Sequence, residues 1–81
     1  GEPITRRQID SIIDSANTYL NGLTNMGALL GGRVECLEED NSASDLADGK
    51  VSFRVYVTPP SPARELMFTM QYDADYLGEI F

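Results

Sequence analysis

The residues best suited to chemistry are a single cysteine and a run of acidic side chains. The chain has no histidine, so the commonest general base and metal ligand is missing. Cys36 stands beside Val34 in an apolar stretch, with no candidate base near it in the sequence. This setting favours a buried core thiol over a nucleophile. We therefore expect no catalytic residue and no enzyme activity.

The acidic residues raise the question of a calcium loop: Glu38, Glu39, Asp40, Asp45 and Asp48. An EF-hand loop that begins at Asp40 needs Gly at its sixth position and Glu at its twelfth. Asp45 and Val51 stand at those two positions. The pattern is therefore typical of a solvated acidic loop, and we expect neither a metal site nor a cofactor.

Charge and hydropathy limit the classes of partner. Six basic and thirteen acidic residues give a formal net charge of −7, which is unfavourable for binding a phosphate backbone. No stretch approaches the roughly 18 consecutive apolar residues of a membrane span. We expect neither nucleic acid nor a membrane as partner. A single Cys cannot form an internal disulfide, which fits an intracellular, reducing origin.

The first secondary-structure element that the sequence predicts is a helix from about Arg6 to Leu23. Thr5 followed by Gln8 is typical of a capping box at its start. The next stretch, Met26 to Gly32, fits either a final helical turn or a buried connection. The apolar positions recur at helical spacing: Ile9, Ile12, Ile13, Ala16, Leu20 and Leu23.

After Gly32 the apolar period changes to two, which predicts strands. The three stretches are Arg33 to Glu38, Lys50 to Thr58, and Glu65 to Tyr72. An acidic loop with a short helical turn separates the first two, with Ser42 or Ser44 as its cap and Asp48-Gly49 as its stop. Each strand has one apolar face. It consists of Val34 and Cys36 in the first strand, of Val51, Phe53, Val55 and Val57 in the second, and of Leu66, Phe68, Met70 and Tyr72 in the third.

One helix and three strands predict an α+β fold: a long N-terminal amphipathic helix packed on a small, mostly antiparallel three-stranded sheet. The helix should contact Phe53, Val55, Phe68 and Met70. We expect residues 1–81 to be a single domain of modest stability, cut from a longer chain because no initiator Met is present. Residues 74–81 fit either a short turn or an extended arm.

The sequence resembles the C-terminal domain of contractile tail sheath proteins from phages and phage-like particles of Gram-positive bacteria. The resemblance covers about residues 4–81 and is carried by "YLNGL" and by "GGRVECLEEDNSASDLADGKVSFRVYVTPPSPARELMFTMQYDADYL". Its most specific portion is "GKVSFRVYVTPPSPARE", Gly49 to Glu65. Cys36 departs from the family pattern, where an aromatic or aliphatic residue is expected.

The resemblance implies a structural role. Sheath subunits stack as rings in a helical sleeve around an inner tube, and the C-terminal domain lies near the tube and links neighbouring subunits. Extended arms from those neighbours add strands to its sheet. The implied partners are other sheath subunits, in a homo-oligomeric sleeve, and the tail tube protein. The implied location is the tail of a virion or phage-like particle, assembled in the cytoplasm of the bacterial host.

Two sets of residues become candidate contacts. An exposed sheet edge is a template for an added strand, so the last strand supplies the candidates for sheath-sheath binding. We expect this strand to pair within its own domain, with a swapped strand as the alternative. The candidates on it and just before it are Arg64, Glu65, Met67, Thr69 and Gln71.

The second set is Arg6 and Arg7, at the predicted helix start. Cations are disfavoured near a helix N-terminus, so their presence there fits either ordinary surface charge or contact with an acidic partner, which we take to be the tail tube. The alternative function is a small ligand-binding or regulatory α+β module. Such a module would bind a metabolite and stay monomeric.

Overall fold

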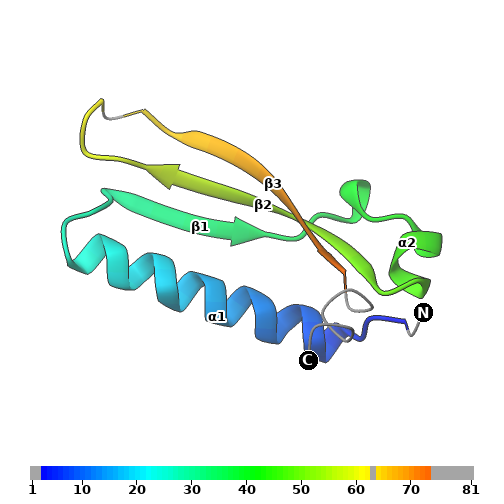
Figure 1. Ribbon diagram of the computed structural model, residues 1–81. Coiled ribbons are helices and arrows are strands. Elements are labelled where there is room, and N and C mark those ends of the chain that lie inside the picture. The colour runs from blue at the N-terminus through cyan, green and yellow to red at the C-terminus, as the bar shows by residue number, and fades with distance from the viewer. Residues whose placement is uncertain (1–2, 63, 74–81) are drawn as a thin grey trace.

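A computed structural model describes residues 3–62 and 64–73. One long helix, α1, packs on one side of a three-stranded antiparallel sheet in the order β1-β2-β3 (Figure 1). The α+β prediction is confirmed. The expected turn or arm at residues 74–81 lies outside the described residues. The elements are α1 (Arg6–Asn25), β1 (Gly31–Glu35), the 3-10 helix η1 (Glu38–Asp40), α2 (Ala43–Ala47), β2 (Lys50–Thr58) and β3 (Leu66–Asp73).

Both ends of α1 have a clear physical cause. At the start, the Gln8 N–H donates to Thr5 Oγ1 at 3.1 Å and the Thr5 N–H donates to Gln8 Oε1 at 2.8 Å, which is the predicted capping box. At the end, Gly27 adopts φ 83° and the Ala28 N–H donates to the Leu23 carbonyl at 2.9 Å. This arrangement is a Schellman motif, so the helix runs two residues beyond the predicted end. The connection after it is exposed at Met26 rather than buried.

The sheet follows the predicted alternation closely. β2 has the predicted bounds, and β3 is shifted by one residue from its predicted position. β1 starts two residues before and ends three residues before the predicted strand, whose last residue, Glu38, begins η1. The register places Val34 opposite Val55, and it places Phe53 opposite Met70. Directly opposite residues share a face, so one side of all three strands is apolar.

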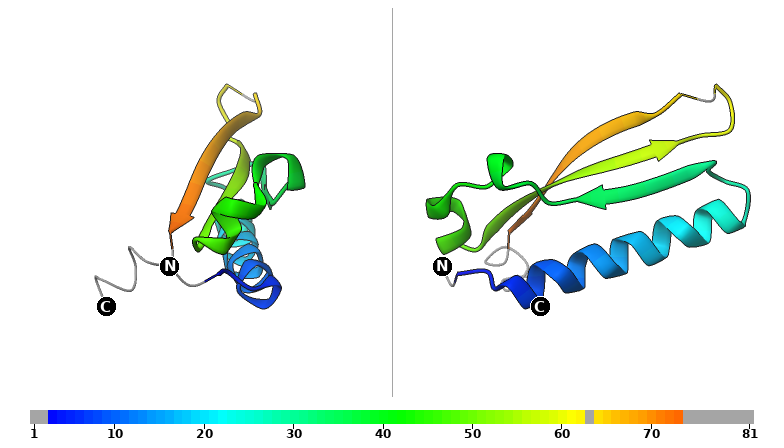
Figure 2. Two further views of the ribbon diagram at one scale, coloured as in Figure 1. Left: turned by 90° about the vertical axis from the view of Figure 1, so that its right-hand side faces the viewer. Right: turned by 180° about the vertical axis from the view of Figure 1, so that it is seen from behind.

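The core lies between α1 and the β1 side of the sheet. Its buried members are Leu20, Val34, Val51 and Phe53. At the closest approach, a Cβ added to Gly32 would lie 3.3 Å from Leu20 Cβ. Helix α1 therefore lies along β1, as Figure 1 and the right view of Figure 2 show.

The predicted contact of the helix with Phe68 and Met70 is wrong. These side chains do lie on the helix side of the sheet, yet Leu66, Phe68 and Met70 are 42%, 51% and 59% exposed. A helix about 10 Å wide covers roughly two strands spaced about 4.8 Å apart. Since α1 lies along β1 at one edge, the apolar face of β3 at the other edge stays open.

Candidate functional site

The two edges of the sheet differ in whether another strand can join them. At β1, the Val34 N–H donates to the side-chain Oδ1 of Asn17 on α1 at 3.0 Å. A side chain of the helix thus bonds an amide that points outward from this edge, and the helix packs closely against β1 at Gly32. β1 is a poor template for an added strand.

Asn41 fixes which backbone groups point to each side of β2. The Ser52 N–H donates to Asn41 Oδ1 at 2.7 Å, and Asn41 Nδ2 donates to the Ser52 carbonyl at 3.1 Å and to the Leu37 carbonyl at 2.7 Å. Asn41 is buried just beyond the end of β1. The Ser52 backbone therefore points toward the β1 side. Since direction alternates along a strand, Val51 and Phe53 point toward β3.

The same alternation identifies the outward-pointing groups of β3. Phe53 is opposite Met70, so the Met70 backbone bonds toward β2, as does that of Phe68 opposite Val55. The residues between them direct their N–H and C=O groups away from the sheet: Met67, Thr69 and Gln71. Within the described residues no strand lies beyond β3. This edge is an open template for strand pairing.

Glu65, predicted to touch a neighbouring subunit, is engaged within the domain. Its Oε2 lies 2.9 Å from Nη1 of Arg33, which also bonds Glu35 at 3.1 Å and lies 4.0 Å from the centre of the Tyr56 ring. The hydrogen bonds with Glu35 and then Glu65 raise the pKa of Arg33. These exposed contacts are individually weak. Together they tie Glu65, at the end of the proline-rich connection, to the polar face of β1.

Arg64 lies in that connection, where its N–H donates to the Pro62 carbonyl at 2.8 Å. Its side chain is exposed just before β3. The structure therefore brings Arg64 and Glu65 next to the start of β3. Met67, Thr69 and Gln71 follow along the open edge.

Arg54 anchors the acidic loop to the polar face of the sheet. Its guanidinium forms two hydrogen bonds with Asp40, at 2.7 and 2.8 Å, and approaches Glu39 at 3.7 Å. The hydrogen bond with Asp40 raises the pKa of Arg54. The acidic run therefore serves in part to hold η1 against β2. Among residues 3–62 and 64–73, no group of three or more metal-ligating side chains is placed to hold a metal ion.

Arg6 and Arg7 are exposed at the start of α1, at the opposite end of the molecule from the start of β3 (Figure 1). The Arg6 guanidinium lies 3.5 Å from the Asp10 carboxylate, so an internal ion pair offsets part of its unfavourable position. The structure does not bring this pair of arginines together with Arg64 and Glu65.

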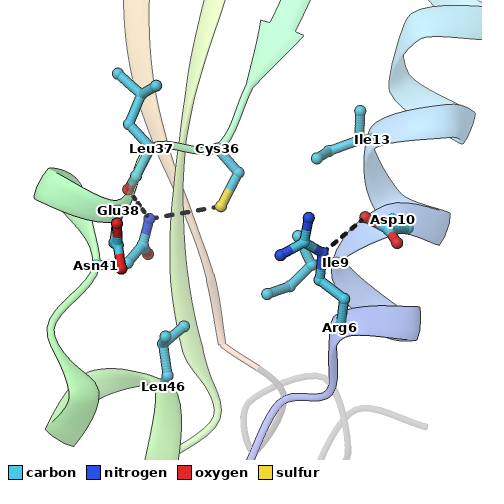
Figure 3. Close-up of a pocket in the computed structure, with 9 residues that line it drawn as sticks. All are labelled: Arg6, Ile9, Asp10, Ile13, Cys36, Leu37, Glu38, Asn41 and Leu46. Carbon is cyan, nitrogen blue, oxygen red and sulfur yellow. Dashed lines mark hydrogen bonds and ion pairs between the residues drawn. The ribbon is translucent and has the colours of Figure 1, made fainter.

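Arg6 also borders a cavity of about 400 Å³ between α1 and the acidic loop (Figure 3). Cys36 lines this cavity and is partly buried, so the predicted buried thiol packs against the core without being enclosed by it. Its Sγ lies 3.5 Å from Asn41 Nδ2. Burial raises the pKa of the thiol, which keeps it protonated and a poor nucleophile.

The second cavity lies beside the open strand. It measures about 160 Å³ and has almost entirely apolar walls from α1 and all three strands. We call it the α1–β3 groove, and its lining residues are Ile12, Ala16, Val34, Phe53, Val55, Met70, Gln71 and Tyr72. The sequence could not reveal it, because an alternating pattern does not tell which strand one helix leaves uncovered. No helix in the described part of the chain is long and apolar enough to cross a membrane.

Comparisons with known proteins agree on one family. The profile described as the phage tail sheath C-terminal domain matches residues 1–73. A curated protein described as a prophage major tail sheath protein, from Pseudomonas aeruginosa (strain UCBPP-PA14), is 29% identical over 77 residues. The alignment covers 95% of this chain and 20% of that protein, so the chain spans about a fifth of the relative's length. No solved structure matches the chain significantly. The match over nearly the whole described chain shows that the chain belongs to the phage tail sheath C-terminal domain family.

Proposed function

We propose that this domain links neighbouring sheath subunits by accepting an added strand along β3. Its family gives it a structural role in a phage or prophage tail, with other sheath subunits as partners. The observation that carries the proposal is the contrast between the two edges. Asn17 occupies an amide of β1, whereas Met67, Thr69 and Gln71 direct their backbone groups outward.

Strand addition at one edge suits a helical sleeve. The joining surface differs from the segment that docks on it, so the contact is heterologous. A heterologous contact that does not close on itself builds an open helix. A domain with two open edges would instead permit pairing in two ways.

The proline-rich connection assists by holding β3 in place. Pro59, Pro60 and Pro62 restrict the backbone between β2 and β3, and the Arg33–Glu65 ion pair ties its end to β1. We assign Glu65 a positioning role within the domain. Arg64, Met67, Thr69 and Gln71 are the proposed contacts with the added strand.

A proline scan of β3 in the full-length parent protein tests this proposal. Thr69→Pro removes an outward N–H, so the domain should fold and the sleeve should fail to form. The matched control is Phe68→Pro, which removes an N–H that bonds β2. It should lower the free energy of unfolding by about 3 kcal/mol or more, so the domain should not fold. Circular dichroism reports folding and electron microscopy reports assembly. Normal sleeves from a folded Thr69→Pro protein would refute the proposal.

We further propose that Arg6 and Arg7 contact the tail tube, supported by their exposure and by their placement at a helix N-terminus. The 81 residues would act as one domain of a longer parent, assembled in the host cytoplasm without nucleic acid, a cofactor or catalysis. The alternative of a small ligand-binding module is supported by the cavity beside Cys36. Family membership outweighs it.

A further inference from the structure

The apolar face of β3 forms an open surface with the neighbouring flank of α1. Leu66, Phe68 and Met70 are about half exposed, and Met70 lines the α1–β3 groove. Tyr19 on α1 is 68% exposed and lies three residues after Ala16, hence on the same flank as the helix residues that line the groove. Large exposed apolar side chains gathered on one side of a domain make that side a candidate binding surface.

Strand addition would leave this surface uncovered. A fourth strand beside β3 would lie about 4.8 Å farther from α1, in the plane of the sheet. The side chains of Phe68 and Met70 project out of that plane, toward the helix side. Their cover must therefore come from a segment lying against the face of β3, next to α1.

We propose that residues 74–81 of the same chain fill the α1–β3 groove. The chain leaves β3 at Asp73, directly after Gln71 and Tyr72, which line the groove. Eight residues can span up to about 26 Å, and the eight residues of β3 span about 24 Å. The segment is therefore long enough to reach all of the exposed face.

The composition of the segment matches an apolar surface. Half of "ADYLGEIF" is large and apolar. Its large apolar residues are Tyr76, Leu77, Ile80 and Phe81. This inference goes beyond the proposed linkage of subunits and does not depend on it.

Tryptophan fluorescence of the 81-residue chain tests the inference. The chain contains no Trp, so Phe81→Trp introduces a single reporter. We expect blue-shifted emission and reduced acrylamide quenching compared with a free indole, at every protein concentration. Adding Phe68→Asp should abolish both effects, because it places a charge in the apolar surface.

Met67→Asp is the matched control. Met67 precedes Phe68 and is equally exposed at 51%, yet its side chain lies on the opposite face of β3. It should leave the emission unchanged. If circular dichroism shows that Phe68→Asp unfolds the chain, Met70→Lys replaces it, since Met70 is 59% exposed.

Three outcomes would overturn the inference. Emission like that of a free indole means that the segment is solvated. A blue shift that survives both groove substitutions means that the segment lies elsewhere. A blue shift that appears only as the concentration rises means that the groove holds a second copy's segment. None of these outcomes bears on strand addition, because the experiment involves no sleeve.

Discussion

Asn41 connects three parts of the domain through one side-chain amide. It is buried, and it bonds the backbone of Leu37 and of Ser52 as a short continuation of β1 would. The sequence pattern indicated the capping residues Thr5 and Gln8, because a helix start has a local signature. It did not indicate Asn41 or Asn17. Their bonds join segments distant in sequence and follow no periodicity.

Asn41→Ala should destabilise the domain by about 2–3 kcal/mol, because buried backbone groups lose their partners. Urea denaturation of the isolated chain measures the effect. Asn21→Ala, the same substitution at an exposed position on α1, is the control and should change stability by about 0.5 kcal/mol or less. Equal effects of the two substitutions would show that the Asn41 network contributes nothing.

Arg6 and Arg7 allow a test that separates stability from partner binding. Replacing both by Glu puts favourable charge at the helix N-terminus, so the isolated domain should gain about 0.3–1 kcal/mol, less the small contribution of the Arg6–Asp10 pair. Tube-templated sheath assembly at low ionic strength should nevertheless weaken. Thermal denaturation and electron microscopy measure the two effects. Unimpaired assembly of the double variant would rule out the tube contact.

At the scale of elements, the start of α1 and both bounds of β2 follow from the sequence, because caps and apolar period act locally. The position of α1 on the sheet does not follow from it. The pattern shows which face of each strand is apolar, whereas the close contact of Gly32 with Leu20 determines which strand the helix covers. The exposed face of β3 is the consequence.

Gly32→Ala tests the close approach of α1 to β1. The added Cβ would lie 3.3 Å from Leu20 Cβ and 3.3 Å from the Tyr56 carbonyl oxygen. Neither atom is at the end of a flexible side chain, so we expect a loss of about 1–3 kcal/mol from overpacking. Gly31→Ala is the neighbouring control, since nothing lies within 4 Å of its added Cβ. Urea midpoints compare the two, and an unchanged midpoint for Gly32→Ala would contradict tight helix packing.

At the scale of the whole molecule, the two edges of the sheet differ: Asn17 of α1 bonds an amide of β1, whereas no strand of the described residues lies beyond β3. Alternation in the sequence indicated three strands with a shared apolar face, and the family resemblance indicated that such a sheet receives strands from neighbours. Which edge is open depends on the helix and on Asn17, so only the three-dimensional arrangement reveals it. The molecule is asymmetric in the way that a directional, one-sided assembly requires.

Hydrogen exchange should record this asymmetry amide by amide. In the isolated domain the amides of Thr69 and Gln71 should exchange quickly because they point outward, whereas those of Phe68 and Met70 should be protected by their bonds to β2. Assembly of the parent protein into sleeves should protect Thr69 and Gln71. Exchange in sleeves that are dissociated after quenching can be measured by mass spectrometry with residue resolution.

The Val34 amide is the internal control for that experiment. It already donates to Asn17 at 3.0 Å, so its exchange should change little when subunits join. Protection of β3 with no change at β1 is the result that strand addition along β3 requires. If assembly protected the β1 amides and left Thr69 and Gln71 exchanging as in the isolated domain, subunits would be joined through the helix-covered edge or another surface. The assignment of β3 as the linking strand would then be wrong.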